Sequence, residues 1–250
     1  MSDGTRYGKI AGFPQTRYSA VRAVASADAS ERSIGFDKLC AVYWKPVYSY
    51  LRLKWRKERD EAQDLAQQFF VHVLEKNTFA AFDPRKSRFR TFVRLCLDHF
   101  VANELKAAAR IKRGGEARFV PLETEDEDGE LRRIEIADDT DIEAEFDRAW
   151  LRGIFAVALS ELRAATSSER RQLYFTVFER YDIQRDEHHA VTYDQLARDY
   201  NLPVTQITNY LSAMRRRFRS TVLEKLREVT GSDEEFVEEA QAMLGLKIER

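Results

Sequence analysis

The sequence is poor in the residues that build disulfide frameworks and tight turns. It has two cysteines, Cys40 and Cys96, which lie far apart with no CxxC spacing. Neither a disulfide scaffold nor a zinc finger is therefore indicated, and a reducing cytoplasm fits best. Glycine and proline are also scarce, at 10 and 5 of the 250 residues. Because helix-period patterns outnumber alternating ones, we expect an all-α fold.

Long hydrophobic runs and catalytic motifs are missing as well. The first residues, MSDGTRYGKIAGF, lack the apolar core of a signal peptide, and no window approaches the roughly 18 apolar residues of a membrane span. No G-x-S-x-G, P-loop or H-E-x-x-H pattern occurs, so we expect no enzyme, no cofactor and no small-molecule substrate. The adjacent His188 and His189 have no further ligand at useful spacing, so we expect no metal site.

Charge is nearly balanced overall, with a formal net charge of -1, but it is unevenly distributed. Residues 85–113 hold nine Lys or Arg against two acids, whereas residues 116–145 hold thirteen acids against three arginines. Such segregation is a reason to suspect polyanion binding by the basic part, but a charge run taken alone is more often an ordinary solvated face. The acidic block has little helical pattern, so we expect a flexible linker over residues 115–144.

Three segments before this linker, residues 36–51, 60–76 and 88–113, each show one apolar helical stripe. Pro46 lies within the first of them and is expected to bend or break the helix. The outer face of the second is acidic and amide-rich, with Glu61, Asp64, Gln68 and Glu75. The third carries an outer stripe of His99, Asn103, Lys106 and Arg110. This donor-rich stripe suits phosphates and base edges, or it is a solvated helix back.

After the linker, residues 192–219 (TYDQLARDYNLPVTQITNYLSAMRRRFR) predict two helices joined by a tight turn. Thr192 and Gln195 form a capping-box pattern, Asn201 suits a left-handed turn, and Pro203 suits the first turn of the second helix. The expected buried side is Val204, Ile207, Leu211, Met214 and Phe218. The opposite stripe is Thr205, Asn209, Ser212, Arg216 and Arg219. This pattern is typical of a DNA-binding helix-turn-helix, although helical hairpins also serve packing alone.

Together these segments resemble an RNA polymerase sigma factor of the extracytoplasmic-function type, in the sigma-70 family, over nearly the whole chain. RDEAQDLAQQFFVHVLEK resembles the polymerase-docking helix. FDPRKSRFRTFVRLCLDHFVANELKAAARIKRGG resembles the promoter-melting helix with the loop before it. QLARDYNLPVTQITNYLSAMRRRFRSTVLEKL resembles the promoter-reading helix-turn-helix. FPQTRYSAV and SDEEFVEEAQAMLG are similar to a large-genome bacterial subgroup with extended ends.

The resemblance implies a bacterial transcription initiation factor whose partners are core RNA polymerase and promoter DNA. The polymerase-binding residues would be Glu61, Asp64, Gln67 and Gln68. The promoter-melting residues would be Arg88, Arg90, His99, Asn103, Lys106 and Arg110, with aromatic side chains of the loop NTFAAFDPRKSR stacking on the opened strand. The upstream element would be contacted by Thr205, Gln206, Thr208, Asn209, Ser212, Arg215, Arg216 and Arg219. Control by an anti-sigma factor or a regulatory kinase stays open.

The expected organisation has five parts. They are an N-terminal extension (1–33), a sigma region 2-like domain (34–114), the acidic linker (115–144), a region 4-like helix-turn-helix domain (145–230) and a C-terminal helical extension (231–250). Two other functions stay open: a helix-turn-helix regulator that binds DNA without polymerase, and a protein–protein adaptor.

Overall fold

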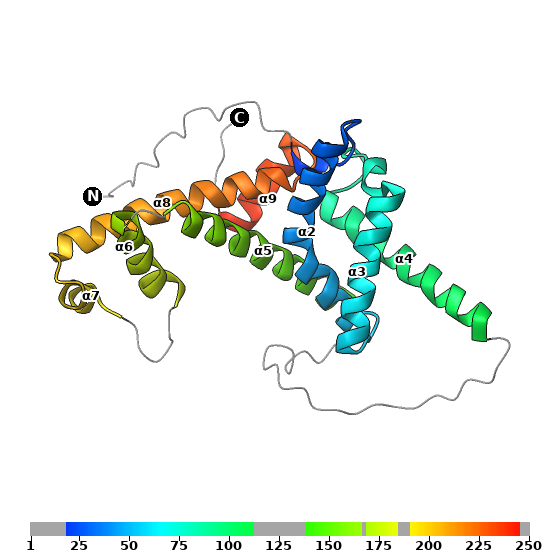
Figure 1. Cartoon of the computed structure of the whole chain (residues 1–250), viewed down its shortest axis with the longest axis horizontal. Coiled ribbons are helices and arrows are strands. Elements are labelled where there is room, and N and C mark those ends of the chain that lie inside the picture. Colours follow the sequence, from blue (N-terminus) through cyan, green and yellow to red (C-terminus); the bar gives the residue numbers. More distant parts are fainter. Residues whose placement is uncertain (1–18, 113–138, 167–168, 185–190, 246–250) are drawn as a thin grey trace, which may run out of the picture.

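The computed structural model describes residues 19–112, 139–166, 169–184 and 191–245, and it is helical with no strand among them (Figure 1). The predicted all-α class is therefore confirmed. The α-helices are α1 (Ala20–Ala23), α2 (Ala29–Leu53), α3 (Arg59–Lys76), α4 (Phe89–Lys112), α5 (Asp139–Ala164), α6 (Glu169–Phe178), α7 (Tyr193–Asp199), α8 (Val204–Glu228) and α9 (Asp233–Leu244). A 3-10 turn, η1 (Thr78–Ala81), follows α3, and a π-helical turn, η2 (Glu179–Ile183), follows α6.

The larger of two hydrophobic cores lies among α1 to α4, the first part of α5, the second half of α8, and α9. The apolar stripes predicted for α2, α3 and α4 face this core. Aromatic side chains dominate it: Phe69, Phe79 and Phe89 are almost fully buried, with Phe79 edge-on to Phe89 at a centroid distance of 5.3 Å. Edge-to-face packing of this kind stabilises beyond the area that it buries.

Pro46 does not end α2, which continues as one helix to Leu53. Because proline has no N–H, the carbonyl of Val42, four residues earlier, loses its usual helical donor. Gly153 of α5 lies against that carbonyl, so close that an added Cβ would stand 2.5 Å from the oxygen. Of the predicted bend or break, the break is wrong, and the proline marks the point where α5 approaches the backbone of α2.

Gly153→Ala is expected to destabilise the protein by about 1–3 kcal/mol, because the new methyl group meets backbone that cannot rotate away. Helix propensity alone favours alanine over glycine by about 1 kcal/mol, so the two effects oppose each other. Urea unfolding followed by far-ultraviolet circular dichroism measures the balance. A more stable Gly153→Ala protein would contradict the close approach.

Parts of both expected terminal extensions belong to the larger core. The hydroxyl of Ser19, which precedes α1, donates to the carbonyl of Thr230 at 2.8 Å. Phe236 and Ala240 of α9 are buried. Within the described residues, therefore, 19–33 and 231–245 are integral to the fold rather than appended to it.

The smaller core lies among the end of α5, α6, α7 and the first half of α8. Both α5 and α8 cross from one core to the other: Ile154 packs in the larger core and Leu162 in the smaller, and Phe218 of α8 packs against both. Figure 1 shows these two helices side by side between the two groups. The expected boundary at 144/145 therefore does not separate the cores. Of the expected linker, residues 115–138 lie outside the described part, and 139–144 belong to α5.

Candidate nucleic-acid interface

The helix pair α7 and α8 is joined by the turn that its sequence predicts. The hydroxyl of Thr192 accepts a hydrogen bond from the backbone N–H of Gln195 at 3.2 Å and so caps α7. Asn201 has the expected left-handed backbone, with φ of 51°. Pro203 is the N-cap of α8, one position earlier than predicted, and its carbonyl accepts from the N–H groups of Gln206 and Ile207.

The buried side of α8 begins one turn later than expected. Val204, at the first position of the helix, is 37% exposed, whereas Ile207, Leu211 and Met214 are buried in the smaller core as predicted. Tyr210 is also buried and stacks on Tyr174 of α6 with ring centroids 3.7 Å apart. This aromatic pair, which the sequence did not indicate, helps fix the orientation of α8.

The predicted polar stripe of α8 is exposed along its whole length: Thr205, Asn209, Ser212, Arg216 and Arg219. Gln206 and Thr208 are half-buried, and the hydroxyl of Thr208 donates to the carbonyl of Thr205 at 2.9 Å. The amino end of the helix thus presents small polar side chains. The arginines follow one to two turns later, and neither makes an ion pair within the described residues.

Arg215 has a different environment from its neighbours on α8. Its guanidinium donates two hydrogen bonds of 2.8 Å to Asp182 of η2 and lies 5.6 Å from the ring of Tyr181. Tyr181 in turn stacks on Tyr193 of α7 at 4.9 Å. The hydrogen bonds to Asp182 raise the pKa of Arg215 above its already high value. The guanidinium of Arg215 thus joins α8 to η2. Its side chain is still 45% exposed, so its assignment to DNA stays a prediction.

Two arginines predicted to contact the opened promoter are also engaged within the protein. Arg90 is only 9% exposed, and its guanidinium forms ion pairs with Glu239 of α9 and Asp147 of α5. Arg88 pairs with Glu238 and Glu239. Because a buried, paired guanidinium cannot reach a phosphate, the assignment of Arg90 to DNA is wrong for this conformation. Arg88 remains partly open to solvent.

The predicted loop aromatics are likewise turned inward. Phe79 is buried, and Phe82 is half-buried and packs edge-on against Phe89 at 5.0 Å. They support the start of α4 rather than offering a free stacking surface. The loop is held at Asp83, whose pKa is lowered to about 2 by hydrogen bonds from Arg85.

The second half of α4 retains the exposed stripe that the sequence predicted. His99, Asn103 and Lys106 are all exposed, and Figure 1 shows this part of α4 projecting from the helix group. Arg110 also lies on α4, but its side chain is outside the described residues. A projecting helix with three aligned donor groups is accessible to a polyanion.

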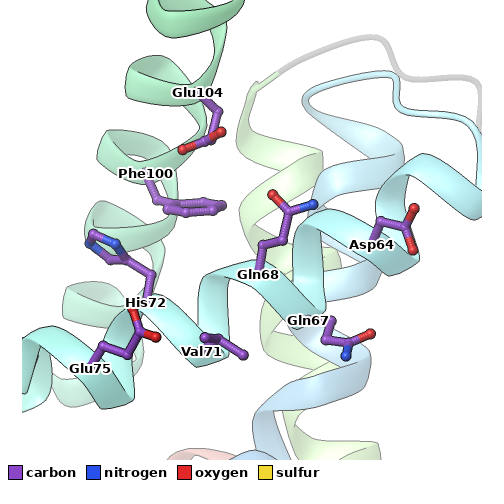
Figure 2. Close-up of a pocket in the computed structure, with 8 residues that line it drawn as sticks. All are labelled: Asp64, Gln67, Gln68, Val71, His72, Glu75, Phe100 and Glu104. Carbon is purple, nitrogen blue, oxygen red and sulfur yellow. The ribbon is translucent and has the colours of Figure 1, made fainter.

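A groove lies between α3 and α4 (Figure 2). It has a volume of about 460 Å³ and contains three of the predicted polymerase-binding residues, Asp64, Gln67 and Gln68. Its other lining residues are Val71, His72, Glu75, Phe100 and Glu104. Acidic and amide groups therefore surround a small apolar centre, an arrangement typical of protein interfaces. The fourth predicted residue, Glu61, is outside this lining and pairs with Lys57.

The acids that neutralise the arginines of α4 were missed at the sequence level. Glu239 and Glu238 are about 150 residues away from Arg88 and Arg90 in the chain, and no local pattern joins them. Their only sequence signature is the acidic cluster of SDEEFVEEAQAMLG, which follows a helix cap at Ser232.

The described residues offer little support for thiol chemistry, a metal site or a membrane span. Burial raises the pKa of Cys40 to about 12 and that of Cys96 to about 11, so neither thiol is activated at neutral pH. The described part holds no cluster of three or more metal-ligating side chains. None of its helices has the length and apolar character to cross a membrane. Comparisons with protein-family models, curated proteins and solved structures give no match.

Proposed function

We propose that the chain is an RNA polymerase sigma factor of the extracytoplasmic-function type, which binds core polymerase, recognises promoter DNA and initiates transcription. The observation that carries the proposal is the presence of two different surfaces on one chain. One is the polar and basic stripe of α8, and the other is the acid-rimmed groove beside the projecting half of α4. A DNA-binding module alone needs only the first.

In this proposal α7 and α8 form a helix-turn-helix, and α8 enters the major groove of the upstream promoter element. Thr205, Asn209 and Ser212 lie in the first turns of α8, where recognition helices meet base edges. Arg216 and Arg219 follow them and are placed to hold backbone phosphates. The bonds from Arg215 to Asp182 keep this helix oriented on the smaller core.

The projecting half of α4 would hold the opened promoter strand. His99, Asn103 and Lys106 offer donors that no carboxylate of the described residues occupies. The charges at the start of α4 are largely neutralised by Glu238, Glu239 and Asp147, so the free protein is expected to bind DNA weakly. Promoter specificity would then depend on polymerase.

The groove between α3 and α4 would receive a basic, partly apolar element of the polymerase large subunit. Asp64→Arg is expected to weaken binding to core polymerase by roughly 1–3 kcal/mol and to leave the fold intact, because Asp64 is exposed at the groove rim. Affinity is measured by fluorescence anisotropy with labelled protein and core enzyme. Glu224→Arg, the same charge reversal at an exposed site of α8, is the control. Equal affinities of the two variants for core polymerase would show that this groove is not the polymerase-binding site.

The proposal as a whole is tested by transcription in vitro from genomic DNA fragments, using core polymerase with and without this protein. Discrete new transcripts are expected only when both are present. A helix-turn-helix regulator would instead bind specific DNA tightly by itself and produce no transcripts with core enzyme. A protein–protein adaptor would bind DNA under no condition.

A further inference from the structure

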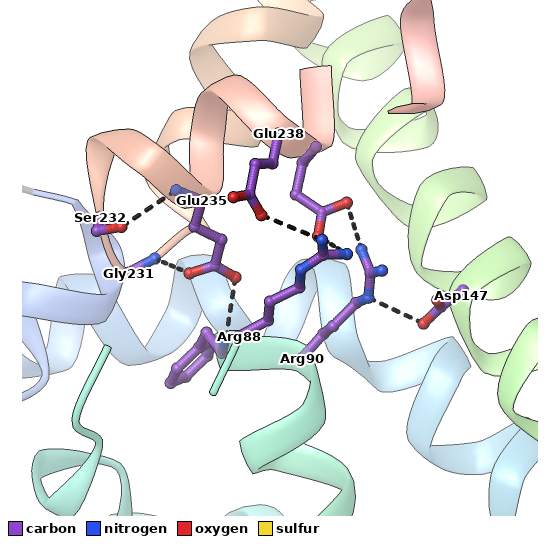
Figure 3. Close-up of polar contacts among 9 residues, drawn as sticks. Arg88, Arg90, Asp147, Gly231, Ser232, Glu235 and Glu238 are labelled. Carbon is purple, nitrogen blue, oxygen red and sulfur yellow. Dashed lines mark hydrogen bonds and ion pairs between the residues drawn. The ribbon is translucent and has the colours of Figure 1, made fainter. Parts of the chain in front are cut away.

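The acidic helix α9 lies against the start of α4, as Figure 3 shows. The segment Asp233–Leu244 contains five acids and no basic residue. It contacts α4 where the chain presents a cluster of cations, Arg85, Lys86, Arg88 and Arg90, close to the positive end of the helix dipole. A helix start with this charge is also a favourable place for a phosphate.

One layer of this contact is buried and holds α9 in place. The carboxylate of Glu235 accepts hydrogen bonds from the backbone N–H of Phe89 at 2.9 Å and of Gly231 at 2.7 Å. Burial raises the pKa of Glu235, which these two N–H groups partly oppose. The fully buried Glu239 pairs with Arg90. An added Cβ at Gly231 would lie 2.2 Å from the ring of Phe82, so the turn before α9 also packs tightly on the loop before α4.

The outer layer of the contact is open to solvent. Nη2 of Arg88 lies 3.1 Å from Glu238, and the two side chains are 43% and 60% exposed. Nη1 of Arg88 lies 3.1 Å from the buried Glu239, so Glu238 is the solvent-exposed partner of the two. Such surface ion pairs are weak, and water or another anion can replace one partner without unfolding the helix. A phosphate oxygen matches the arginine fork as well as a carboxylate does. Glu238 can therefore leave Arg88 while Glu235 and Glu239 keep α9 docked.

We propose that Glu238 is an autoinhibitory side chain that occupies Arg88 in the free protein and yields it to a nucleic-acid phosphate. Arg88 immediately precedes α4, and His99 follows eleven residues later, roughly 16 Å along the helix axis. A single nucleic-acid strand can span this distance and contact both side chains. This inference rests on the proposed function for naming the bound polyanion as promoter DNA. The exchange itself is a property of this chain and needs no polymerase.

The test measures binding of the full chain to a fluorescein-labelled single-stranded thymidine 20-mer by anisotropy at low salt. Glu238→Gln is compared with Glu234→Gln, which removes the same charge from an exposed position of α9 that has no ion pair within the described residues. Glu238→Gln is expected to bind roughly two- to five-fold more tightly than Glu234→Gln, as suits the loss of one surface pair. In the Arg88→Gln/Glu238→Gln protein the affinity should fall to that of Arg88→Gln alone.

Three results would overturn the inference. Equal gains for Glu238→Gln and Glu234→Gln would show a general charge effect, and a gain that persists in the double variant would show that Arg88 is not the site. Absence of oligonucleotide binding by wild type and all variants would also exclude it. Circular dichroism verifies that each variant is folded. Failure of the proposed function would appear separately, as absence of transcripts with core polymerase.

Discussion

Glu239→Ala is expected to lower the free energy of unfolding by about 3–5 kcal/mol, because it leaves the guanidinium of Arg90 buried without its main counter-charge. Asp147 alone, with its Oδ1 3.0 Å from Nε of Arg90, is partly exposed and cannot replace a fully buried carboxylate. Urea unfolding monitored by circular dichroism gives the change in free energy. The loss should also release α9 from the start of α4, which proteolysis within residues 231–245 would detect.

Two further variants separate this effect from a simple loss of helix stability. Glu234→Ala, on the exposed face of α9, is expected to change stability by no more than about 0.5 kcal/mol. Arg90→Met/Glu239→Met removes both charges and keeps the apolar volume, so it should recover much of the stability lost in Glu239→Ala. If Glu239→Ala and Glu234→Ala unfold at the same urea concentration, the buried pair does not stabilise α9.

The helices that could be predicted from sequence are those whose stripes are regular. The pattern in α8 placed Ile207, Leu211 and Met214 correctly in the smaller core, because the period of a helix determines which residues share a face. Local chemistry was equally informative at Thr192 and Asn201, where the cap and the left-handed turn depend only on neighbouring residues. Local sequence could not show whether Pro46 breaks its helix, because the effect of a proline depends on what lies beside the freed carbonyl, here Gly153.

The roles of the individual arginines could not be predicted in the same way. Arg88, Arg90 and Arg215 look like Arg216 in a sequence, since each lies in a basic helical segment. What distinguishes them is a carboxylate brought in by the tertiary fold, from α9, α5 or η2. Net charge over a window therefore overstates the charge that is available for DNA.

The way in which α5 and α8 are shared between the two hydrophobic cores could not be predicted from local sequence patterns either. Acidic residues around 139–145 suggested linker, but Ile142, Phe146 and Trp150 form an apolar stripe that packs on the larger core. Helices as long as α5 and α8 can belong to two cores, and a sequence window does not reveal which neighbour covers each part. The two hydrophobic cores are consequently bridged by the continuous helices α5 and α8.

Asn209→Ala and Arg216→Ala are expected to alter promoter use in different ways. Asn209 is exposed in the second turn of α8, where its amide can make paired hydrogen bonds with a base edge, so its loss should change the preferred upstream bases by about 1–3 kcal/mol per contact. Arg216 lies two turns further along, where phosphates are the expected partners. Its loss should weaken all upstream sequences alike and reduce the slope of log affinity against log salt by about 1.

Both effects are measured with core polymerase on a promoter library whose upstream element is randomised, by sequencing the transcribed promoters for each variant. Arg215→Ala is the matched control, because the exposed Arg215 donates to Asp182 of η2, whereas Arg216 has no ion pair within the described residues. It should lower thermal stability without the change in salt dependence expected for Arg216→Ala, since no phosphate contact is lost. An unchanged base preference in Asn209→Ala, Thr205→Ala and Ser212→Ala would mean that this stripe of α8 does not face the bases. If Arg215→Ala reduces the salt dependence as much as Arg216→Ala does, Arg215 also contacts DNA phosphates.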